Sequence, residues 1–286
     1  MLRYLCLLLC SFGLYSTSVN ALVEYNPIHQ KYQQVKNYAK TINQVATVVM
    51  GYYADLLKHQ SSYAGNYPKN IKALQIIGAE LSEVSNDSEL QSQTTFTLTA
   101  QLSYLEQQKL KTQQIQEAFI FKLNQNGALN QVERLQQAPN AKIVDFEFNA
   151  NHYLNRQFAY SWLLLLDGHN AAHLNMFDDS NANYQLVIGA NRFSGHAREA
   201  LEKRKNWMGS GGHLLRSVNV IKALDNNLQL ELIIDWKGIA TNNKWRIAKI
   251  KQVIDIQKSD QAIYKITNIN EQHLLPDIAP WEKILC

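Results

Sequence analysis

The order of apolar and polar positions divides the chain into two helical regions, each followed by a block of strands. From Ile28 to Leu56 apolar residues recur at intervals of three and four, which predicts one long amphipathic helix. The run Gly65–Pro68 ends this helix, because glycine and proline both interrupt helical continuity. Alternating segments joined by turn signals then predict four strands, over residues 74–84, 90–105, 115–123 and 128–135.

The second helical region is more varied than the first. A helix over Tyr153–Leu166 is stopped by Asp167-Gly168, and a shorter helix reaches Phe177. A strand over Tyr184–Ile188 follows. Ser194 is placed to cap a helix over Gly195–Met208, which the glycine-rich run 209–212 closes.

A second strand block then repeats the pattern of the first. Its strands are expected over residues 214–224, 228–240, 244–256 and 261–268. Matched turns lie about 140 residues apart at Asn86 and Asn226, and about 134 apart at Asn126 and Asp260. A nearly constant offset favours duplication of one unit.

These patterns predict an α+β protein with two cone-like units, each a curved antiparallel four-stranded meander packed on helices. We expect a signal peptide over 1–21, a first unit over 22–140 and a second unit over 149–286. Apolar residues on both faces of the second block, among them Leu215 and Ile233, predict a tandem pseudo-dimer in which the sheet of one unit packs on the other.

The first 21 residues resemble a cleavable signal peptide. Arg3 precedes the apolar stretch Tyr4–Tyr15, and Val19 and Ala21 hold the small-residue positions before a cleavage site. We therefore expect cleavage after Ala21, a periplasmic or secreted protein, and no stable membrane insertion, because the stretch is shorter than a membrane span. Cleavage leaves Cys286 as the only thiol, which excludes an internal disulfide and a cysteine-based zinc site.

The charge pattern argues against a nucleic-acid-binding protein. The formal net charge is +4, and the dense basic run Lys203–Lys205 shares its predicted helix with Glu199 and Glu202, as in a solvated helix face. The glycine-rich run 209–212 follows a helix and precedes a strand, the reverse of a phosphate-binding loop. We expect no cofactor.

The second half carries a recognisable order of elements. The helix pair ends with Phe177-Asp178-Asp179, Phe193–His196 opens the third helix, and His213 begins a long meander that contains Trp236 and Trp245-Arg246-Ile247. In this order the region 149–276 resembles the NTF2-like superfamily, which includes the SnoaL-like cyclases, scytalone dehydratase and ketosteroid isomerases. The first half resembles a degenerate NTF2-like or a cystatin-like unit.

The resemblance implies a pocket between the curved sheet and its helices. Alternation over residues 228–236 places Trp236 on the pocket side and Asp235 on the outer face, as a solvated residue or as the partner of Lys237. The side chains expected to bind a ligand are those of Trp162, Tyr184, Arg192, Trp236 and Trp245.

His213 is the catalytic candidate, because the resemblance implies a histidine at the start of this strand and imidazole titrates near neutral pH. The position that corresponds to the dehydratase aspartate falls near Leu164, which cannot transfer a proton. His169 and His173 have the spacing of two metal ligands on a helix, but no third ligand is evident, so we expect no metal site.

Three functions follow from this reading. The absence of an evident acid–base pair favours non-catalytic binding of a small apolar or aromatic ligand, or of a protein partner, through the second unit. The alternative is a SnoaL-like isomerase, cyclase or dehydratase that transfers a proton at His213. The third is a component of envelope assembly that uses its sheet faces for protein contact.

Overall fold

The structure is a computed structural model that describes residues 32–59, 67–84, 93–122, 128–169, 176, 182–224, 226–239, 245–258 and 264–274. The predicted signal peptide, the short helix before Phe177, His173 and Cys286 lie outside the described residues.

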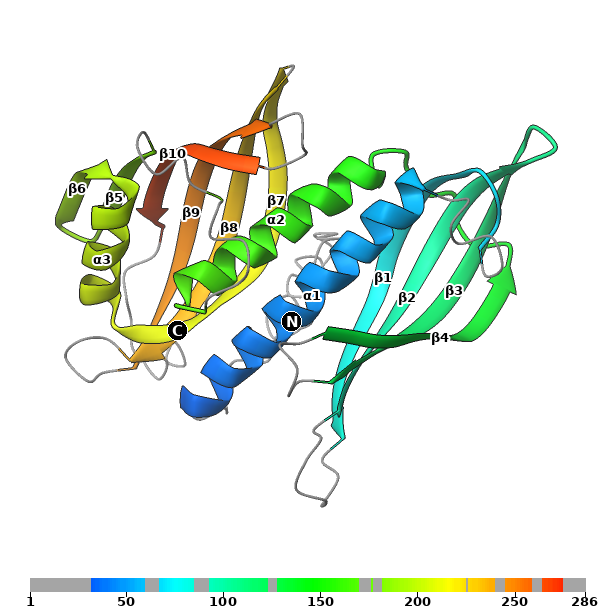
Figure 1. The fold of residues 1–286 in the computed structure, drawn as a ribbon, viewed down its shortest axis with the longest axis horizontal. Coiled ribbons are helices and arrows are strands. Elements are labelled where there is room, and N and C mark those ends of the chain that lie inside the picture. The colour runs from blue at the N-terminus through cyan, green and yellow to red at the C-terminus, as the bar shows by residue number, and fades with distance from the viewer. Residues whose placement is uncertain are drawn as a thin grey trace, which may run out of the picture.

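The described residues of the first half form one helix and one sheet. Helix α1 spans Tyr32–Lys58, and the antiparallel sheet has the order β1-β2-β3-β4 (Figure 1). Its strands span Ile71–Val84, Gln93–Glu106, Lys109–Lys122 and Ala128–Pro139. Strand β3 begins at Lys109 instead of Ile115, because the chain reverses at Gln107 and Gln108 with φ values of 50° and 65°. Such turns usually contain glycine or asparagine, so the sequence carries no signal for this one.

The described residues of the second half form two helices and a larger sheet. Helix α2 spans Ala150–Leu166 and helix α3 spans Ala197–Met208. The six-stranded sheet has the order β6-β5-β10-β9-β8-β7, with β5 parallel to β10 and the other pairs antiparallel. Its strands, β5 to β10, span Asn183–Ile188, Asn191–His196, Ser210–Leu224, Asn227–Ile239, Trp245–Lys258 and Tyr264–His273. The predicted four-stranded meander is therefore present and is extended by the β5–β6 hairpin.

The predicted start of the third helix is wrong. Ser194 does not cap a helix but lies in β6, which pairs with β5 after a turn at Gly189 with φ of 59°. Helix α3 begins two residues later than predicted, at Ala197. The predicted end of this helix is confirmed: α3 ends at Met208, Gly209 caps it with φ of 85°, and β7 begins within the glycine-rich run at Ser210.

The two halves meet through helices, not through sheet faces. Helices α1 and α2 lie side by side between the sheets (Figure 1), and Tyr153 and Tyr160 of α2 share a hydrophobic core with α1 and the first sheet. The hydroxyl of Tyr153 donates to the carbonyl of Leu74 on β1. The expected packing of sheet on sheet is thus wrong, because the helices lie between the apolar faces of the sheets.

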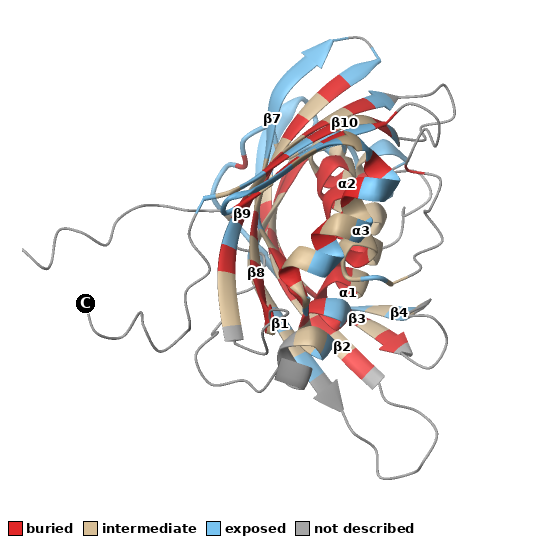
Figure 2. Ribbon diagram, turned by 90° about the vertical axis from the view of Figure 1, so that its left-hand side faces the viewer, coloured by how far each residue is buried: buried red, intermediate tan, exposed pale blue. Residues whose placement is uncertain are grey.

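The second sheet curves around α2 and α3, and the facing residues of the sheet and helices are mostly buried (Figure 2). Their side chains form one hydrophobic core. Leu228, Leu230, Leu232, Ile234 and Trp236 of β8 are buried in this core, as their alternation predicted. Phe158 and Trp162 of α2 pack against the same core. No helix among the described residues has the length and apolar character needed to span a membrane.

Candidate functional site

The end of α2 determines where Asp167 lies. Gly168 has φ of 75°, a conformation that glycine adopts without strain, and the amides of Gly168 and His169 donate to the carbonyls of Leu165 and Leu164. This pair of bonds is the Schellman motif that commonly ends a helix. The Asp-Gly pair predicted as a helix stop therefore fixes the position of Asp167 at the end of α2.

Asp167 forms a pair with His213. Oδ1 of Asp167 lies 2.5 Å from Nδ1 of His213, and Oδ2 accepts a hydrogen bond of 3.2 Å from the backbone amide of the same residue. The two side chains are 2% and 3% exposed, so solvent competes little for these bonds. The pair joins the end of α2 to the beginning of β7.

Arg204 of α3 determines the tautomer of His213. Its Nη2 lies 2.9 Å from Nε2 of the imidazole, and a guanidinium can only donate. Nε2 must therefore be the acceptor, and Nδ1 carries the proton that is donated to Asp167. Burial lowers the pKa of His213, and Arg204 lowers it further while Asp167 opposes the shift, so the imidazole is neutral at neutral pH.

A buried polar network continues from Arg204 into the core. The Nε of Arg204 donates to the carboxylate of Glu271 on β10 at 2.9 Å, and the same carboxylate accepts from Tyr184 and, at 2.6 Å, from Gln252. Gln252 in turn accepts from the indole of Trp162 at 2.7 Å. Burial alone would raise the pKa of Glu271, but Arg204 and His273 hold that pKa well below its usual value. Glu271 is therefore an anion that balances Arg204.

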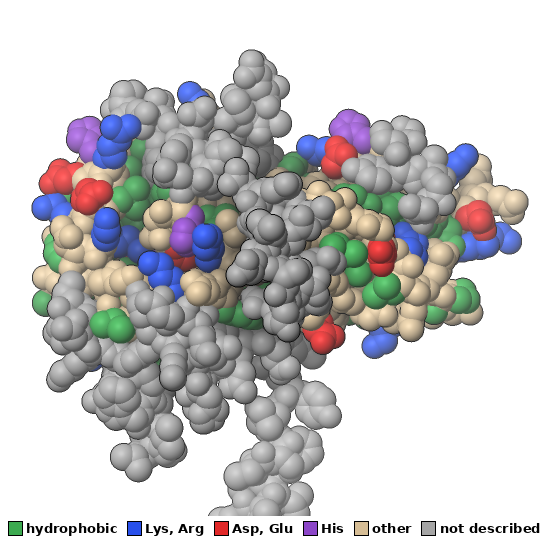
Figure 3. All heavy atoms as spheres, turned by 60° about the horizontal axis from the view of Figure 1, so that its bottom comes forward, with side chains coloured by type: hydrophobic (Ala, Val, Ile, Leu, Met, Phe, Trp, Pro, Cys, Tyr) green, Lys and Arg blue, Asp and Glu red, His purple; other side chains and the backbone are tan. Residues whose placement is uncertain are grey.

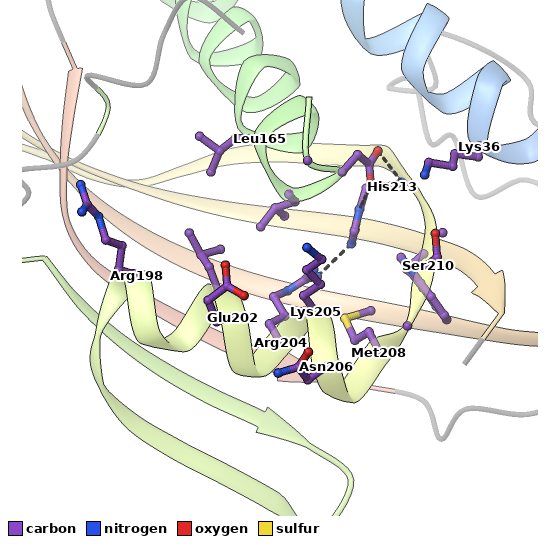
Figure 4. A pocket seen from close by; sticks show the side chains of 17 residues that line it. Lys36, Leu165, Arg198, Glu202, Arg204, Lys205, Asn206, Met208, Ser210 and His213 are labelled. Atoms are coloured by element: carbon purple, nitrogen blue, oxygen red, sulfur yellow. Dashed lines mark hydrogen bonds and ion pairs between the residues drawn. The ribbon is translucent and has the colours of Figure 1, made fainter. Parts of the chain in front are cut away.

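A cavity of about 930 Å³ opens beside the Asp167–His213 pair. Its wall combines the end of α2, helix α3, the first residues of β7, Trp236 and, from the first half, Lys36 of α1 (Figure 4). Lys36, Arg198, Arg204 and Lys205 contribute positive charge to it, against Asp167 and Glu202. Lys and Arg side chains also gather around a histidine on the face drawn in Figure 3, on the side of the second half.

The residues predicted for the site do not lie together. His213 and Trp236 line the cavity. Trp162 and Tyr184 are buried in the core, where both take part in the polar network. Arg192 is exposed on β6, away from the cavity wall, and Trp245 begins β9 with a side chain outside the described residues. The pocket lies at the mouth of the cone, since the interior expected to hold a ligand is packed.

Asp235 does not pair with Lys237 as one reading of the sequence allowed. Its carboxylate accepts a hydrogen bond of 2.6 Å from Arg216 of the neighbouring strand β7. The prediction that Asp235 lies outside the pocket agrees with this contact.

Sequence reasoning missed three residues of the site. Asp167 was predicted only as part of a helix stop, and the position expected for the acid was that of Leu164, one turn earlier. Arg204 was assigned to a solvated face, although it shares a helix face with the buried Ala197, Ala200 and Met208. Glu271 lies beyond the predicted end of the last strand. It follows the buried Ile269 by two residues and so lies on the same buried face of the strand. Helical and strand periodicity could have found the last two.

No group of three or more potential ligands that could hold a metal ion is present in the described ranges. His169 has a buried Nε2 without a hydrogen-bond partner there, but His173 lies outside them.

A second buried carboxylate lies in the first half. Glu117 of β3 accepts hydrogen bonds from Tyr53 at 2.9 Å, from Tyr67 at 2.6 Å and from Arg134 at 2.9 Å. The Arg134 side chain is 18% exposed, so this pair is closer to solvent than the pair of Arg204 and Glu271. It has no contact with the cavity wall described above.

No protein-family model and no curated protein matches the chain. Among solved structures, a proposed aromatic ring hydroxylase from Novosphingobium aromaticivorans is similar, with 18% identity and a TM-score of 0.37, over 45% of this chain and 93% of that one. A hexachlorocyclohexane dehydrochlorinase, LinA-type3 from Novosphingobium barchaimii, has 14% identity and a TM-score of 0.36, over 44% and 89% of the two chains. LinA type 2 has 12% identity and a TM-score of 0.36, over 44% and 88%. These neighbours have the SnoaL/NTF2-like fold, and each similarity covers less than half of this chain.

Proposed function

We propose that the second half catalyses proton transfer on a small molecule bound at the mouth of the cone, with His213 as general base. The observation that carries the proposal is the pairing of His213 with Asp167 at the wall of a cavity of about 930 Å³. The carboxylate holds the proton on Nδ1 and stabilises the imidazolium that forms when Nε2 accepts a proton. The reaction class is abstraction of a carbon-bound proton, the first step of an isomerisation, a cyclisation or an elimination.

Arg204 has two roles in this proposal. In the structure its Nη2 donates a hydrogen bond to Nε2 of His213. This bond occupies the basic nitrogen until a substrate displaces it. The guanidinium keeps its place during displacement, because Nε stays bonded to Glu271. The released Nη2 then donates to the substrate oxygen on which negative charge develops, an electrostatic stabilisation of the enolate. The proton moves from carbon to Nε2, and its electron pair stays on the substrate.

The second candidate function is non-catalytic binding at the same cavity. It is favoured by the hydrogen bond between Arg204 and Nε2 and by the burial of His213, which are typical of a structural histidine. In this case Asp167, His213 and Arg204 only connect α2, β7 and α3. A structural histidine and a base respond differently to conservative substitution, so the two functions can be separated.

The experiment is deuterium exchange into small cyclic ketones in D₂O, followed by proton NMR of the carbon next to the carbonyl. The purified protein is compared with His213→Gln and with His59→Gln, a matched control in which the exposed histidine at the end of α1 is replaced. Proton transfer predicts exchange with the unmodified chain and the control, and loss of exchange in His213→Gln. Exchange at the same rate in all three proteins contradicts general-base catalysis.

We also propose that the mature chain acts after export. The apolar stretch after Arg3 and the small residues before Ala21 support this location. The mass of the protein purified from its own host tests it, since cleavage removes the residues up to Ala21.

A further inference from the structure

We propose that the two halves form one binding site and that Lys36, from the helix of the first half, binds an acid group of the ligand. The ligand class is a small carboxylate whose acid group lies between Lys36 and Lys205 while the rest of the molecule faces Trp236 and His213. This inference deepens the proposed function and rests on it only for the chemistry at His213. The binding of the carboxylate stands independently.

A buried hydrogen bond joins helix α1 to strand β7 at His213. The side-chain amide of Asn43, which is fully buried, donates a hydrogen bond of 2.9 Å to the backbone carbonyl of His213. The Oδ1 of the same amide has no partner in the described part of the chain, a cost that an apolar residue would not carry. Asn43 is therefore a connection between the halves at the position of the base.

This connection determines the position of Lys36. Lys36 precedes Asn43 by seven residues, about two helical turns, so both side chains lie on one face of α1. That face is directed toward the second half, and Lys36 is part of the cavity wall together with His213. Figure 4 shows Lys36 extending from α1 toward the side of the cavity where His213 lies.

The charges of the wall favour an anion. Arg204 is neutralised by Glu271, and Asp167 is bonded to His213, so neither group is available to a ligand in the resting structure. Neither Lys36 nor Lys205 forms an ion pair with any carboxylate of the described residues. Glu202 is the opposing charge on the rim. Two unpaired ammonium groups in a concave wall concentrate anions there.

A ligand with an acid group as well as an apolar part uses both kinds of surface in this wall. Leu165, Leu166, Leu201, Met208 and Trp236 give the wall an apolar surface, and the other lining residues are charged, polar or glycine. A molecule with one flat or aliphatic part and one acid group matches both surfaces. The acid group also orients the molecule, so that one end alone reaches His213.

The test compares pairs of small molecules that differ only in charge. Benzoic, naphthoic and hexanoic acids and their primary amides are titrated into the protein, and the dissociation constants are measured by ligand-observed NMR. We expect at least one acid to bind more tightly than its amide, by about fivefold or more. Lys36→Gln should remove most of this preference, whereas Lys58→Gln, an exposed lysine at the other end of α1, should retain it.

The outcomes separate this inference from the proposed function. The preference for acids should persist in His213→Gln, where proton transfer is lost. If no acid in the set binds more tightly than its amide, the carboxylate site is refuted, whatever the exchange experiment gives. A preference that is equal in Lys36→Gln, Lys58→Gln and the unmodified chain refutes the role of the first half.

Discussion

The guanidinium Nε of Arg204 lies 2.9 Å from both carboxylate oxygens of Glu271, and the two side chains are 4% and 0% exposed. The pair connects α3 to β10 beneath the cavity. Two charges in such a place stabilise the fold only as long as both are present, because each alone would be a buried charge without a counterion.

Glu271→Gln should therefore lower the free energy of unfolding by about 3 kcal/mol or more. The equivalent change in the first half, Glu117→Gln, should cost less, about 1–2 kcal/mol, because Arg134 is 18% exposed and can be hydrated. Glu231→Gln breaks a pair with Lys251 whose side chains are 21% and 38% exposed, and should cost below about 1 kcal/mol. Urea denaturation followed by circular dichroism measures all three. Equal losses would show that burial does not govern these pairs.

Asp167→Asn should lower the rate of deuterium exchange by about 100-fold or more, because the imidazolium formed at His213 loses its counterion. Asp55→Asn, an exposed aspartate on α1, is the matched control and should leave the rate unchanged. The pH profile provides a second measurement. Burial lowers the pKa of His213, so exchange should persist as the pH falls below about 6.5.

The direction in which the pH profile of exchange shifts in Asp167→Asn distinguishes a base from a structural histidine. Asp167 raises the pKa of His213 against the effect of burial, so the pKa should fall further in Asp167→Asn. The acidic limb of the profile should then move to lower pH. A limb that stays in place, with a rate that falls nonetheless, would argue that another group accepts the proton.

Most elements and their order were predictable from the sequence, apart from strand β6, while the site was only partly so. Period-two alternation identified the buried face of β8 and with it Trp236, because a strand with one buried face leaves a clear pattern. The turn at Gln107 and Gln108 and the hairpin that contains Ser194 left no such signal. His213 was found from a resemblance, but its partner Asp167 was not, since a residue at a helix end belongs to neither periodicity. The contact between Asn43 and His213 joins residues 170 positions apart, which no local pattern predicts.

Gly211 determines how Trp236 lies in the cavity wall. A Cβ at this position would lie 2.5 Å from both the carbonyl oxygen of Lys237 and Nε1 of Trp236. Gly211→Ala should thus displace the indole and destabilise the protein by about 1–3 kcal/mol. Gly78→Ala is the control, since its Cβ would meet Thr99 at an ordinary 3.5 Å. The NMR signal of the Trp236 indole N–H should shift in the first variant alone, and an unchanged signal would refute the contact.

His152 of α2 should make stability depend on pH. Burial, with a smaller contribution from Arg156, lowers the pKa of His152 to about 4, below the ordinary value of 6.5. Between these values the unfolded chain binds a proton that the folded chain does not, so the free energy of unfolding falls as the pH falls from about 6.5 to 4. The loss contributed by His152 is on the order of 3 kcal/mol at most.

The contribution of His152 can be isolated, because other groups titrate in the same window. Burial also lowers the pKa of His213, and protonation of Glu271 removes stability at still lower pH. These contributions are common to the unmodified chain and to His152→Gln, so they cancel in the difference between the two unfolding curves. That difference should change by the amount given above between about pH 6.5 and 4 and be constant above this range. Two parallel curves would mean that His152 is hydrated in the folded protein and that the N-terminal end of α2 is less tightly packed than its contacts with Phe148 and Tyr153 indicate.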